Sequence, residues 1–185
     1  VPTTPFDYIG LFNAAMKSKS PTLLLEHQAF YDSKGMIPAD DLDYIVRFGK
    51  AKVVRSGSDV TVVTHGWMVP QSLAAAEVLA DEGIEVDVLD LRTLDDAGLD
   101  YDTIGASLDT TGVMVTVEQA PRCNSIGAKI ARQCEQRFFD FLDGPTASVN
   151  APDAPLAVSR RLEQACMPSV DEVVETVRLA ALRRL

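Results

Sequence analysis

Short apolar runs alternate with helix-length stretches over most of this chain, and this alternation constrains the fold more than any other feature. Residues 60–64 (VTVVT) are β-branched throughout, as expected for a central strand of a sheet that is covered on both faces. Further strands are predicted at residues 50–55, 85–89, 112–117 and 146–149. The first of these four is predicted to be an edge strand.

Helix signals lie between and after the predicted strands. Helices are predicted after Pro70, over residues 101–108 and 125–142, and after Ser169. Gly83 is expected to end the first of them, because glycine adopts the left-handed backbone that closes many helices. The final helix is expected to begin with a capping box, in which Ser169 and Glu172 bond to each other's backbone N–H groups.

Strands separated by helices of this length pair in parallel through right-handed crossovers. We therefore predict an α/β fold with an open, mostly parallel sheet covered by helices on both faces. In such a fold a ligand binds at the carboxyl ends of the strands, near a topological switch point.

The first third of the chain does not continue this pattern. Residues 4–17 place Phe6, Ile9, Phe12 and Met16 at helical spacing, and residues 22–27 (TLLLEH) are predicted to form a short buried strand. The next stretch, from Asp32 to Asp43, holds Gly35, Pro38 and four aspartates, and we expect it to be an exposed linker.

Charge and composition exclude several classes of function. A net charge of -10 argues against sequence-independent binding to DNA or RNA. No apolar stretch approaches the roughly 20 residues that span a bilayer, and residues 1–5 carry no sign of a secretory signal. Cys123, Cys134 and Cys166 are too far apart for a zinc site or a disulfide framework, which favours reduced thiols in a cytosolic setting.

Chemical motifs are largely missing, so single residues are the candidates. The sequence contains no dinucleotide-binding or phosphate-binding glycine loop, no nucleophile elbow and no His-Glu-x-x-His pattern. His65 and Glu118 end predicted strands, where α/β folds gather functional groups. His27 follows an apolar run and could line a cavity or an interface, and Arg92 follows a strand directly. For each of these residues, a local hydrogen bond or ion pair is the alternative interpretation.

Six collinear phrases resemble one known family. They are PTLLLEHQAFY, GKAKVVRSGSDVTVVTHGWMV, SLAAAEVLADEGIEVDVLDLRTL, YDTIGASLDTTGVMVTVEQA, SIGAKIARQCEQRFFDFLDGP and RRLEQACMPSVDEVVETV. In this order and at these spacings they resemble the β subunit of the thiamin-diphosphate-dependent pyruvate and branched-chain 2-oxo-acid dehydrogenases. The resemblance covers nearly the whole chain.

The resemblance implies a fragment with two unequal parts. Residues 1–33 would be the remnant of the end of a pyrimidine-binding domain, and residues 34–185 a transketolase-like C-terminal domain. The family's activating glutamate and its active-site histidine loop would lie upstream, so no catalytic, cofactor-binding or metal-binding residue is assigned to this chain. The chain alone is therefore expected to be inactive, with no cofactor bound.

The parent enzyme would decarboxylate a 2-oxo acid and transfer the acyl group to lipoamide, using thiamin diphosphate and Mg²⁺ held between subunits. Its expected partners are an α subunit and a second β subunit in a heterotetramer, and a dihydrolipoyl acyltransferase. The expected location is the cytoplasm of a bacterial cell, with the mitochondrial matrix as an alternative.

The resemblance also implies a docking role for the end of the chain. Glu163, with Asp171 and Glu172 behind it, would meet a small basic domain of the acyltransferase, where charge steers association. A solvated acidic surface is the alternative explanation. The apolar residues of the first 30 positions are expected to pack on the second domain or on another chain.

Two other identities remain open at this point. The chain could be the last domain of another thiamin enzyme, such as a transketolase or a deoxyxylulose-phosphate synthase. It could also be a stand-alone, non-catalytic α/β interaction module.

Overall fold

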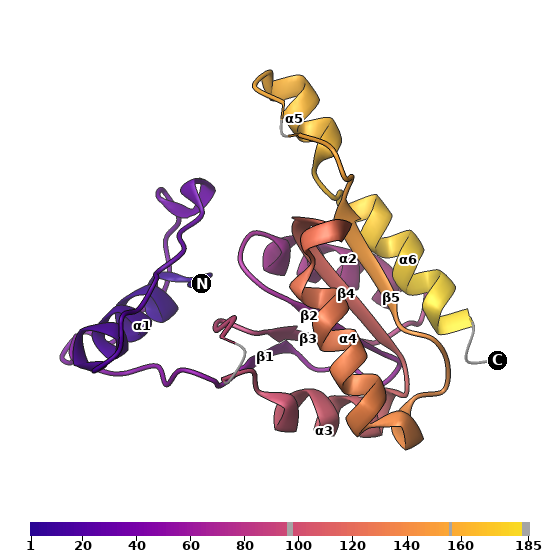
Figure 1. Ribbon diagram of the computed structural model, residues 1–185, viewed down its shortest axis with the longest axis horizontal. Coiled ribbons are helices and arrows are strands. Elements are labelled where there is room, and N and C mark those ends of the chain that lie inside the picture. The colour runs from indigo at the N-terminus through magenta and orange to yellow at the C-terminus, as the bar shows by residue number, and fades with distance from the viewer. Residues whose placement is uncertain (96–97, 156, 183–185) are drawn as a thin grey trace.

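The computed structural model describes residues 1–95, 98–155 and 157–182. Its centre is a five-stranded sheet in the order β1-β3-β2-β4-β5 (Figure 1). The strands are β1 Lys52–Arg55, β2 Val60–Thr64, β3 Val86–Asp90, β4 Met114–Pro121 and β5 Ala147–Ala151. β1 is antiparallel to β3, and every other neighbouring pair is parallel, which confirms the predicted mostly parallel α/β sheet with β1 at its edge.

The central strands are covered on both faces. All five residues of β2 and all five of β3 are buried, and Val62 pairs with Val88 in register. Burial of both alternating faces accounts for the unbroken β-branched run, because a half-covered strand would alternate apolar with polar residues.

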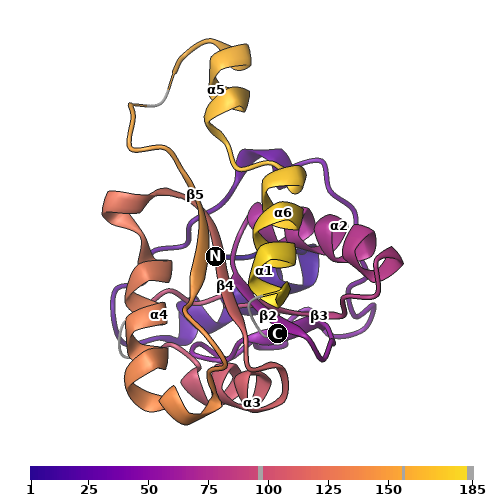
Figure 2. The ribbon, with the colours of Figure 1, turned by 90° about the vertical axis from the view of Figure 1, so that its right-hand side faces the viewer.

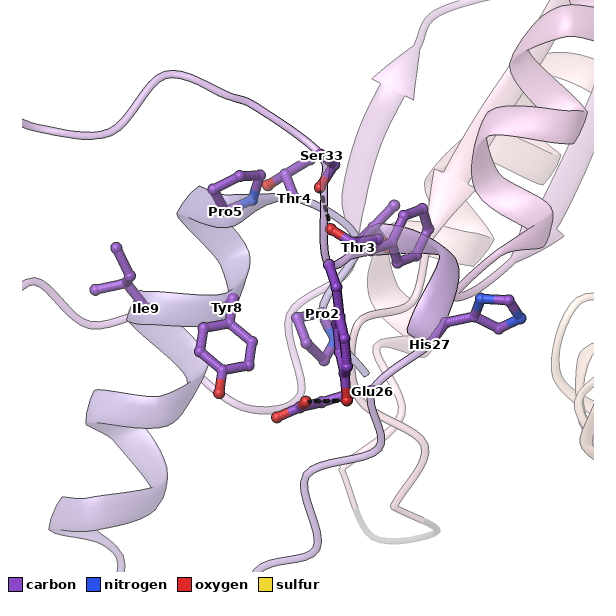
Figure 3. A pocket seen from close by; sticks show the side chains of 11 residues that line it. Pro2, Thr3, Thr4, Pro5, Tyr8, Ile9, Glu26, His27 and Ser33 are labelled. Carbon is purple, nitrogen blue, oxygen red and sulfur yellow. Dashed lines mark hydrogen bonds between the residues drawn. The ribbon is translucent and has the colours of Figure 1, made fainter.

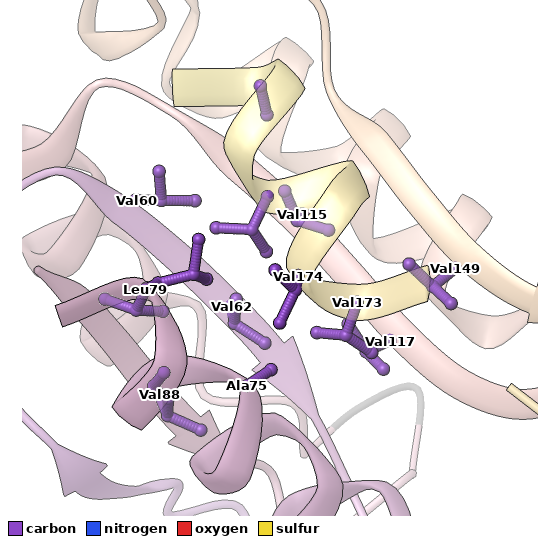
Figure 4. Packing of buried hydrophobic residues seen from close by; sticks show 14 of the residues in the cluster. Val60, Val62, Ala75, Leu79, Val88, Val115, Val117, Val149, Val173 and Val174 are labelled. Atoms are coloured by element: carbon purple, nitrogen blue, oxygen red, sulfur yellow. The ribbon is translucent and has the colours of Figure 1, made fainter. Parts of the chain in front are cut away.

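Two helix layers enclose the sheet. The helices α2 Met68–Asp81 and α6 Val170–Leu182 pack on one face, where valines from four strands pack with Val173 and Val174 (Figure 4). The helices α3 Tyr101–Thr111 and α4 Ile126–Arg137 cover the other face through Ile104, Leu108 and Ile130. Burial of such side chains contributes roughly 1.5–3 kcal/mol each.

The ends of the helices follow local signals. Gly83 follows α2 with a φ of 82°, as expected of a glycine that stops a helix. The capping box of α6 is confirmed: Ser169 Oγ accepts from the Glu172 N–H at 3.2 Å, and Glu172 Oε2 accepts from the Ser169 N–H at 2.8 Å.

One predicted helix is too long. α4 ends at Arg137, not at residue 142, and a short 3₁₀ turn follows at Phe139–Phe141. Phe138, where the backbone leaves the helix, packs against Gly105 of α3, where an added Cβ would lie 2.6 Å from the ring. Tertiary packing of this ring therefore overrides the continuing helical spacing of apolar residues.

The N-terminal segment (residues 1–49) lies to one side of the sheet (Figure 1). It holds α1 Pro5–Lys17, which begins where Thr4 Oγ1 accepts from the Asp7 N–H at 3.1 Å. The linker expected between Asp32 and Asp43 has no helix or strand and is largely exposed.

The predicted strand at residues 22–27 is wrong. This segment is not a strand, and Leu23 and Leu25 are 89% and 56% exposed. No neighbouring strand within the described part of the chain offers it backbone partners, and a lone extended segment has nothing to stabilise it as a strand.

The apolar face expected on α1 is largely exposed. Phe12 is 45% exposed, and α1 buries Asp7, Gly10 and Leu11 instead. The Gly10 carbonyl accepts from the Val46 N–H at 3.0 Å, an approach that a side chain at position 10 would block. Phe6 of this face stacks on Tyr44 of the predicted second domain, with ring centroids 4.6 Å apart, whereas packing of Phe12 on another chain stays a prediction.

Candidate functional site

A topological switch point lies between β2 and β4. These strands are parallel neighbours, yet α2, which follows β2, covers one face of the sheet, and α4, which follows β4, covers the other (Figure 2). Where successive helices leave toward opposite faces, the carboxyl ends of the two strands are where α/β folds bind ligands.

His65 and Glu118 meet at this switch point. His65 follows β2 directly, and Glu118 lies in the carboxyl half of β4. The His65 Nε2 atom is 3.7 Å from Glu118 Oε2, and the glutamate side chain is only 2% exposed. The structure thus brings together two residues that the sequence places 53 positions apart.

Three donors converge on the other carboxylate oxygen of Glu118. Its Oε1 atom accepts from the Gly127 N–H at 2.9 Å, from Asn150 Nδ2 at 3.2 Å, and from the Ser125 hydroxyl. Ser125 and Gly127 belong to the start of α4, and Asn150 lies on β5. Glu118 therefore links the first turn of α4 to the edge of the sheet, and its position near a helix N-terminus suits its negative charge.

These contacts keep Glu118 ionised. Burial by itself would raise the pKa of the Glu118 carboxyl. The nearby imidazole of His65 and the hydrogen bonds from Ser125 and Gly127 lower this pKa by more than burial raises it, so the pKa lies below its usual value. Gly127 makes room for this arrangement, because an added Cβ would lie 2.7 Å from Glu118 Oε1 and 2.8 Å from Thr116 Oγ1.

His27 reaches the same end of the sheet from the N-terminal segment. Its ring stacks on Trp67 with centroids 5.3 Å apart, and its Nε2 atom is 3.4 Å from Gln119 Nε2. Gln119 also contacts the Met167 sulfur at 3.5 Å. Burial lowers the pKa of His27, which favours the uncharged ring. The two histidines proposed from sequence thus flank one site, whereas their role in a cavity or interface stays a prediction.

A pocket of about 370 Å³ lies beside His27 (Figure 3). It is formed by residues 2–9 and 26–33, from α1 and the 3₁₀ turn Gln28–Phe30. The Tyr31 hydroxyl donates to Glu26 Oε2 at 3.1 Å within it. The pocket and the switch point share His27, so they are adjacent.

Arg92 fastens the N-terminal segment to the sheet. Its Nη1 atom is 3.1 Å from Asp7 Oδ1 of α1, and its Nη2 donates to the Lys50 carbonyl at 2.8 Å. Asp7 is 1% exposed, and Arg92 holds a left-handed backbone with φ 55°, which is rare for a side chain of this size. The interpretation of Arg92 as an ion-pair and carbonyl-binding residue is confirmed.

The three proposed docking residues are not among the hydrogen-bond or ion-pair partners of His65 and Glu118 within the described residues. Glu163 is exposed on α5 Arg160–Cys166, a short helix that projects from the body of the fold (Figure 1). Asp171 and Glu172 are exposed in the first turn of α6, where the carboxylate of Glu172 already caps Ser169. Glu163 and Asp171 are thus the better-placed carboxylates for a partner.

Among the described residues, no group of three or more His, Cys, Asp or Glu side chains could hold a metal ion. No helix in the same part of the chain is long and apolar enough to cross a membrane.

Sequence reasoning missed part of the site. Asn150 carried no signal, because its role depends on the alignment of β5 beside β4. Ser125 was expected only as a helix start, yet its hydroxyl both accepts from the Ala128 N–H at 2.8 Å and contacts Glu118. The strand-end rule could have found Gln119, which follows Glu118 directly.

Residues 49–173 match the protein family described as transketolase, C-terminal domain. The chain is 39% identical over 178 residues to the acetoin:2,6-dichlorophenolindophenol oxidoreductase subunit beta of Cupriavidus necator. It is 35% identical to the pyruvate dehydrogenase E1 component subunit beta of Rhizobium meliloti over 178 residues, and 35% identical to the mitochondrial subunit beta-2 of the same component of Oryza sativa over 185 residues.

These matches cover 96%, 96% and 99% of the chain, but 51%, 38% and 49% of the relatives. The chain therefore spans about half the length, or less, of these curated relatives. A solved split-gene transketolase, described as an inactive beta4 tetramer, matches 82% of this chain and 48% of its own with a TM-score of 0.66. At 24% identity this likeness shows the fold.

Proposed function

The chain belongs to the transketolase C-terminal domain family, and from that premise we propose that it is the carboxy-terminal part of the β subunit of a 2-oxo-acid dehydrogenase. This proposal rests on the match of 96% of the chain or more to proteins named as β subunits of pyruvate dehydrogenase and of an acetoin oxidoreductase. The parent enzyme would depend on thiamin diphosphate and Mg²⁺ and would transfer an acyl group to lipoamide.

The domain organisation is part of this proposal. Residues 1–33 would be the end of a preceding pyrimidine-binding domain, and residues 34–185 the transketolase-like domain. The exposed apolar side chains of the first part, including Phe12 and Leu23, support this division, because a domain that is whole in itself buries most such residues.

In this proposal the described residues do not hold the coenzyme. Thiamin diphosphate supplies the electron sink for the carbanion that decarboxylation leaves. In the parent enzyme its diphosphate would be bound through a divalent cation. No reaction step is assigned to His65 or Glu118, which hold the start of α4 and the turn after β2.

The chain would serve assembly and docking. An α subunit and a second β subunit would complete a heterotetramer around it, and a dihydrolipoyl acyltransferase would dock at its carboxy-terminal part. The exposed carboxylates of Glu163 on the projecting helix α5 and Asp171 on α6, with Glu172 beside them, support this site for a basic partner. The compartment would be the bacterial cytoplasm, with the mitochondrial matrix as the alternative, since the relative from Oryza sativa is named as mitochondrial.

The test is reconstitution with an α subunit. We expect this chain to co-purify with the α subunit but to show no decarboxylation of pyruvate, a branched-chain 2-oxo acid or acetoin when thiamin diphosphate and Mg²⁺ are added. A β subunit of the relatives' full length, carrying the same residues at its carboxy-terminal end, should restore turnover of one of these substrates. Turnover by this chain alone, or failure of the longer β subunit to support any, would contradict the proposal.

A further inference from the structure

The helix α5 projects from the body of the fold with little to hold it (Figures 1 and 2). None of its residues is buried, and Leu162 is 60% exposed. A helix of seven residues is too short to be stable through its own backbone hydrogen bonds. The orientation of the α5 arm (residues 157–167) is therefore set by contacts at its two ends.

Both ends of the α5 arm are tied to the same short stretch of chain. Before the arm, Asp153 Oδ1 accepts from the Cys123 N–H at 2.9 Å. At its other end, the Met167 sulfur lies 3.5 Å from Gln119 Nε2, and the next residue, Pro168, is buried. Gln119 belongs to β4, and Cys123 lies in the 3₁₀ turn that follows this strand. The end of β4 thus carries both anchors of the arm.

One of these anchors also contacts the N-terminal segment. The same nitrogen of Gln119 is 3.4 Å from Nε2 of His27, whose ring stacks on Trp67. A single side-chain amide therefore touches the N-terminal segment on one side and Met167, at the base of the α5 arm, on the other. Both contacts are longer than a strong hydrogen bond, so the amide holds the arm weakly.

We propose that Gln119 is a positioning residue for the docking site, through which the placement of His27 affects the orientation of the α5 arm and of Glu163 on it. The inference rests on the proposed function only for the role of Glu163, because the coupling itself lies within this chain. In the parent enzyme, docking of the acyltransferase would then depend on the domain that residues 1–33 complete.

Trypsin reports on the arm directly, because Arg160 and Arg161 are exposed on α5. Gln119→Ala should speed cleavage after these residues about fivefold, since the loss of a weak polar contact favours the released arm by about that factor. Cleavage after Arg132 of α4 should stay as slow as before, which excludes general unfolding. Gln136→Ala, which removes an exposed amide from α4, should change neither rate. An unchanged rate at the arm in Gln119→Ala would overturn the proposal.

A double-mutant cycle tests the coupling to the N-terminal segment. His27→Phe keeps a ring to stack on Trp67 but removes Nε2, and it should speed cleavage of the arm about twofold to threefold. In the Gln119→Ala background the same change should have no further effect. In the Asp153→Ala background, where the other anchor is lost, it should still have its full effect. Equal effects of His27→Phe with and without Gln119 would refute the coupling.

Docking distinguishes this inference from the proposed function. With a dihydrolipoyl acyltransferase as the probe, Gln119→Ala should weaken binding about fivefold, in step with release of the arm. If Gln119→Ala releases the arm but the unchanged chain does not bind the acyltransferase, the coupling stands and the docking proposal fails. If the unchanged chain binds and Gln119→Ala binds equally well, Gln119 does not position the docking site and this inference fails.

Discussion

The Nε2 atom of His65 lies 3.7 Å from Oε2 of Glu118, and neither atom has a hydrogen-bond partner within the described structure. Both atoms are buried, and they face each other across the ends of two parallel strands. The arrangement holds the turn after β2 beside the first turn of α4, and it makes Glu118 the most connected side chain of the site.

Glu118→Gln should destabilise the fold by about 1–3 kcal/mol at pH 7, because the amide accepts the three converging hydrogen bonds more weakly than the carboxylate. The folded-state pKa of Glu118 is lowered, so the stability it contributes is present above its ordinary pKa of 4.5 and is lost as pH falls through the folded-state value. Urea unfolding at pH 7 and at successively lower pH should therefore show the gap between variant and unchanged chain closing. A constant gap would mean that the charge of Glu118 plays no part. Glu77→Gln is the matched control.

Gly127→Ala should cost about 1–3 kcal/mol, because the new Cβ would press on Glu118 Oε1 and Thr116 Oγ1, which are held in place. Two other glycines serve as controls. Gly144→Ala has open space around the new Cβ and should leave the free energy of unfolding nearly unchanged. Gly83→Ala also has open space, but its φ of 82° is strained for alanine and should cost about 1 kcal/mol. Urea unfolding of the three variants checks the order, and a Gly127→Ala variant as stable as Gly144→Ala would contradict the packing.

Asp7→Asn should loosen the N-terminal segment. It removes the charge that Arg92 pairs with, and we expect a loss of about 1–3 kcal/mol rather than the full cost of a stranded buried charge, because the segment can undock and expose Arg92 to water. Trypsin should then cut faster after Lys17, Lys19 and Lys34. Arg132→Ala, which breaks an exposed pair with Glu135, should leave the cleavage rate at these sites as it was.

Acidification should change the environment of Trp67, the single tryptophan of the chain. Burial lowers the pKa of His27 below its ordinary value of 6.5, so protonation favours states in which the ring leaves Trp67 for water. The contact is therefore fully stable above pH 6.5 and weakens as pH falls below it. Tryptophan fluorescence should shift over that range, and the shift should vanish in His27→Gln. Persistence of the shift in that variant would assign it to another group.

The proposed docking of a dihydrolipoyl acyltransferase predicts that Glu163→Lys will slow this association at low salt, because it replaces an attractive charge on α5 with a repulsive one. The difference should shrink at high ionic strength, where exposed charges are screened. Glu77→Lys makes the same change of charge on α2 and should have little effect. Equal binding by Glu163→Lys and the unchanged chain at low salt would leave Glu163 as part of a solvated surface.

The sheet was predictable because its signals are local. Residues 60–64 show an unbroken β-branched run, Gly83 ends a helix through its left-handed backbone, and Ser169 begins one through its side-chain cap. The strand predicted at residues 22–27 was wrong because a strand needs a neighbouring strand, and the apolar residues of this segment do not indicate whether one is present. The buried face of α1 could not be predicted from the helix alone. Asp7 is buried there because it pairs with Arg92, which lies 85 residues away in the sequence.

The site was predictable in outline. The rule that ligands gather at carboxyl ends of strands selected His65 and Glu118, and the structure places them together. The rule could not select Asn150, which reaches Glu118 only because β5 lies beside β4, nor the stack of His27 on Trp67, which depends on where the first 49 residues lie.

The reversed direction of β1 has a geometric consequence for everything that precedes it. Lys52, where β1 begins, pairs with Asp90, where β3 finishes. The polypeptide therefore enters the sheet at the rim where its parallel neighbours terminate, and the preceding residues are delivered to that rim without any crossover. This direction brings the N-terminal segment directly to the edge of the sheet that carries His65 and Glu118, where the ring of His27 stacks on Trp67.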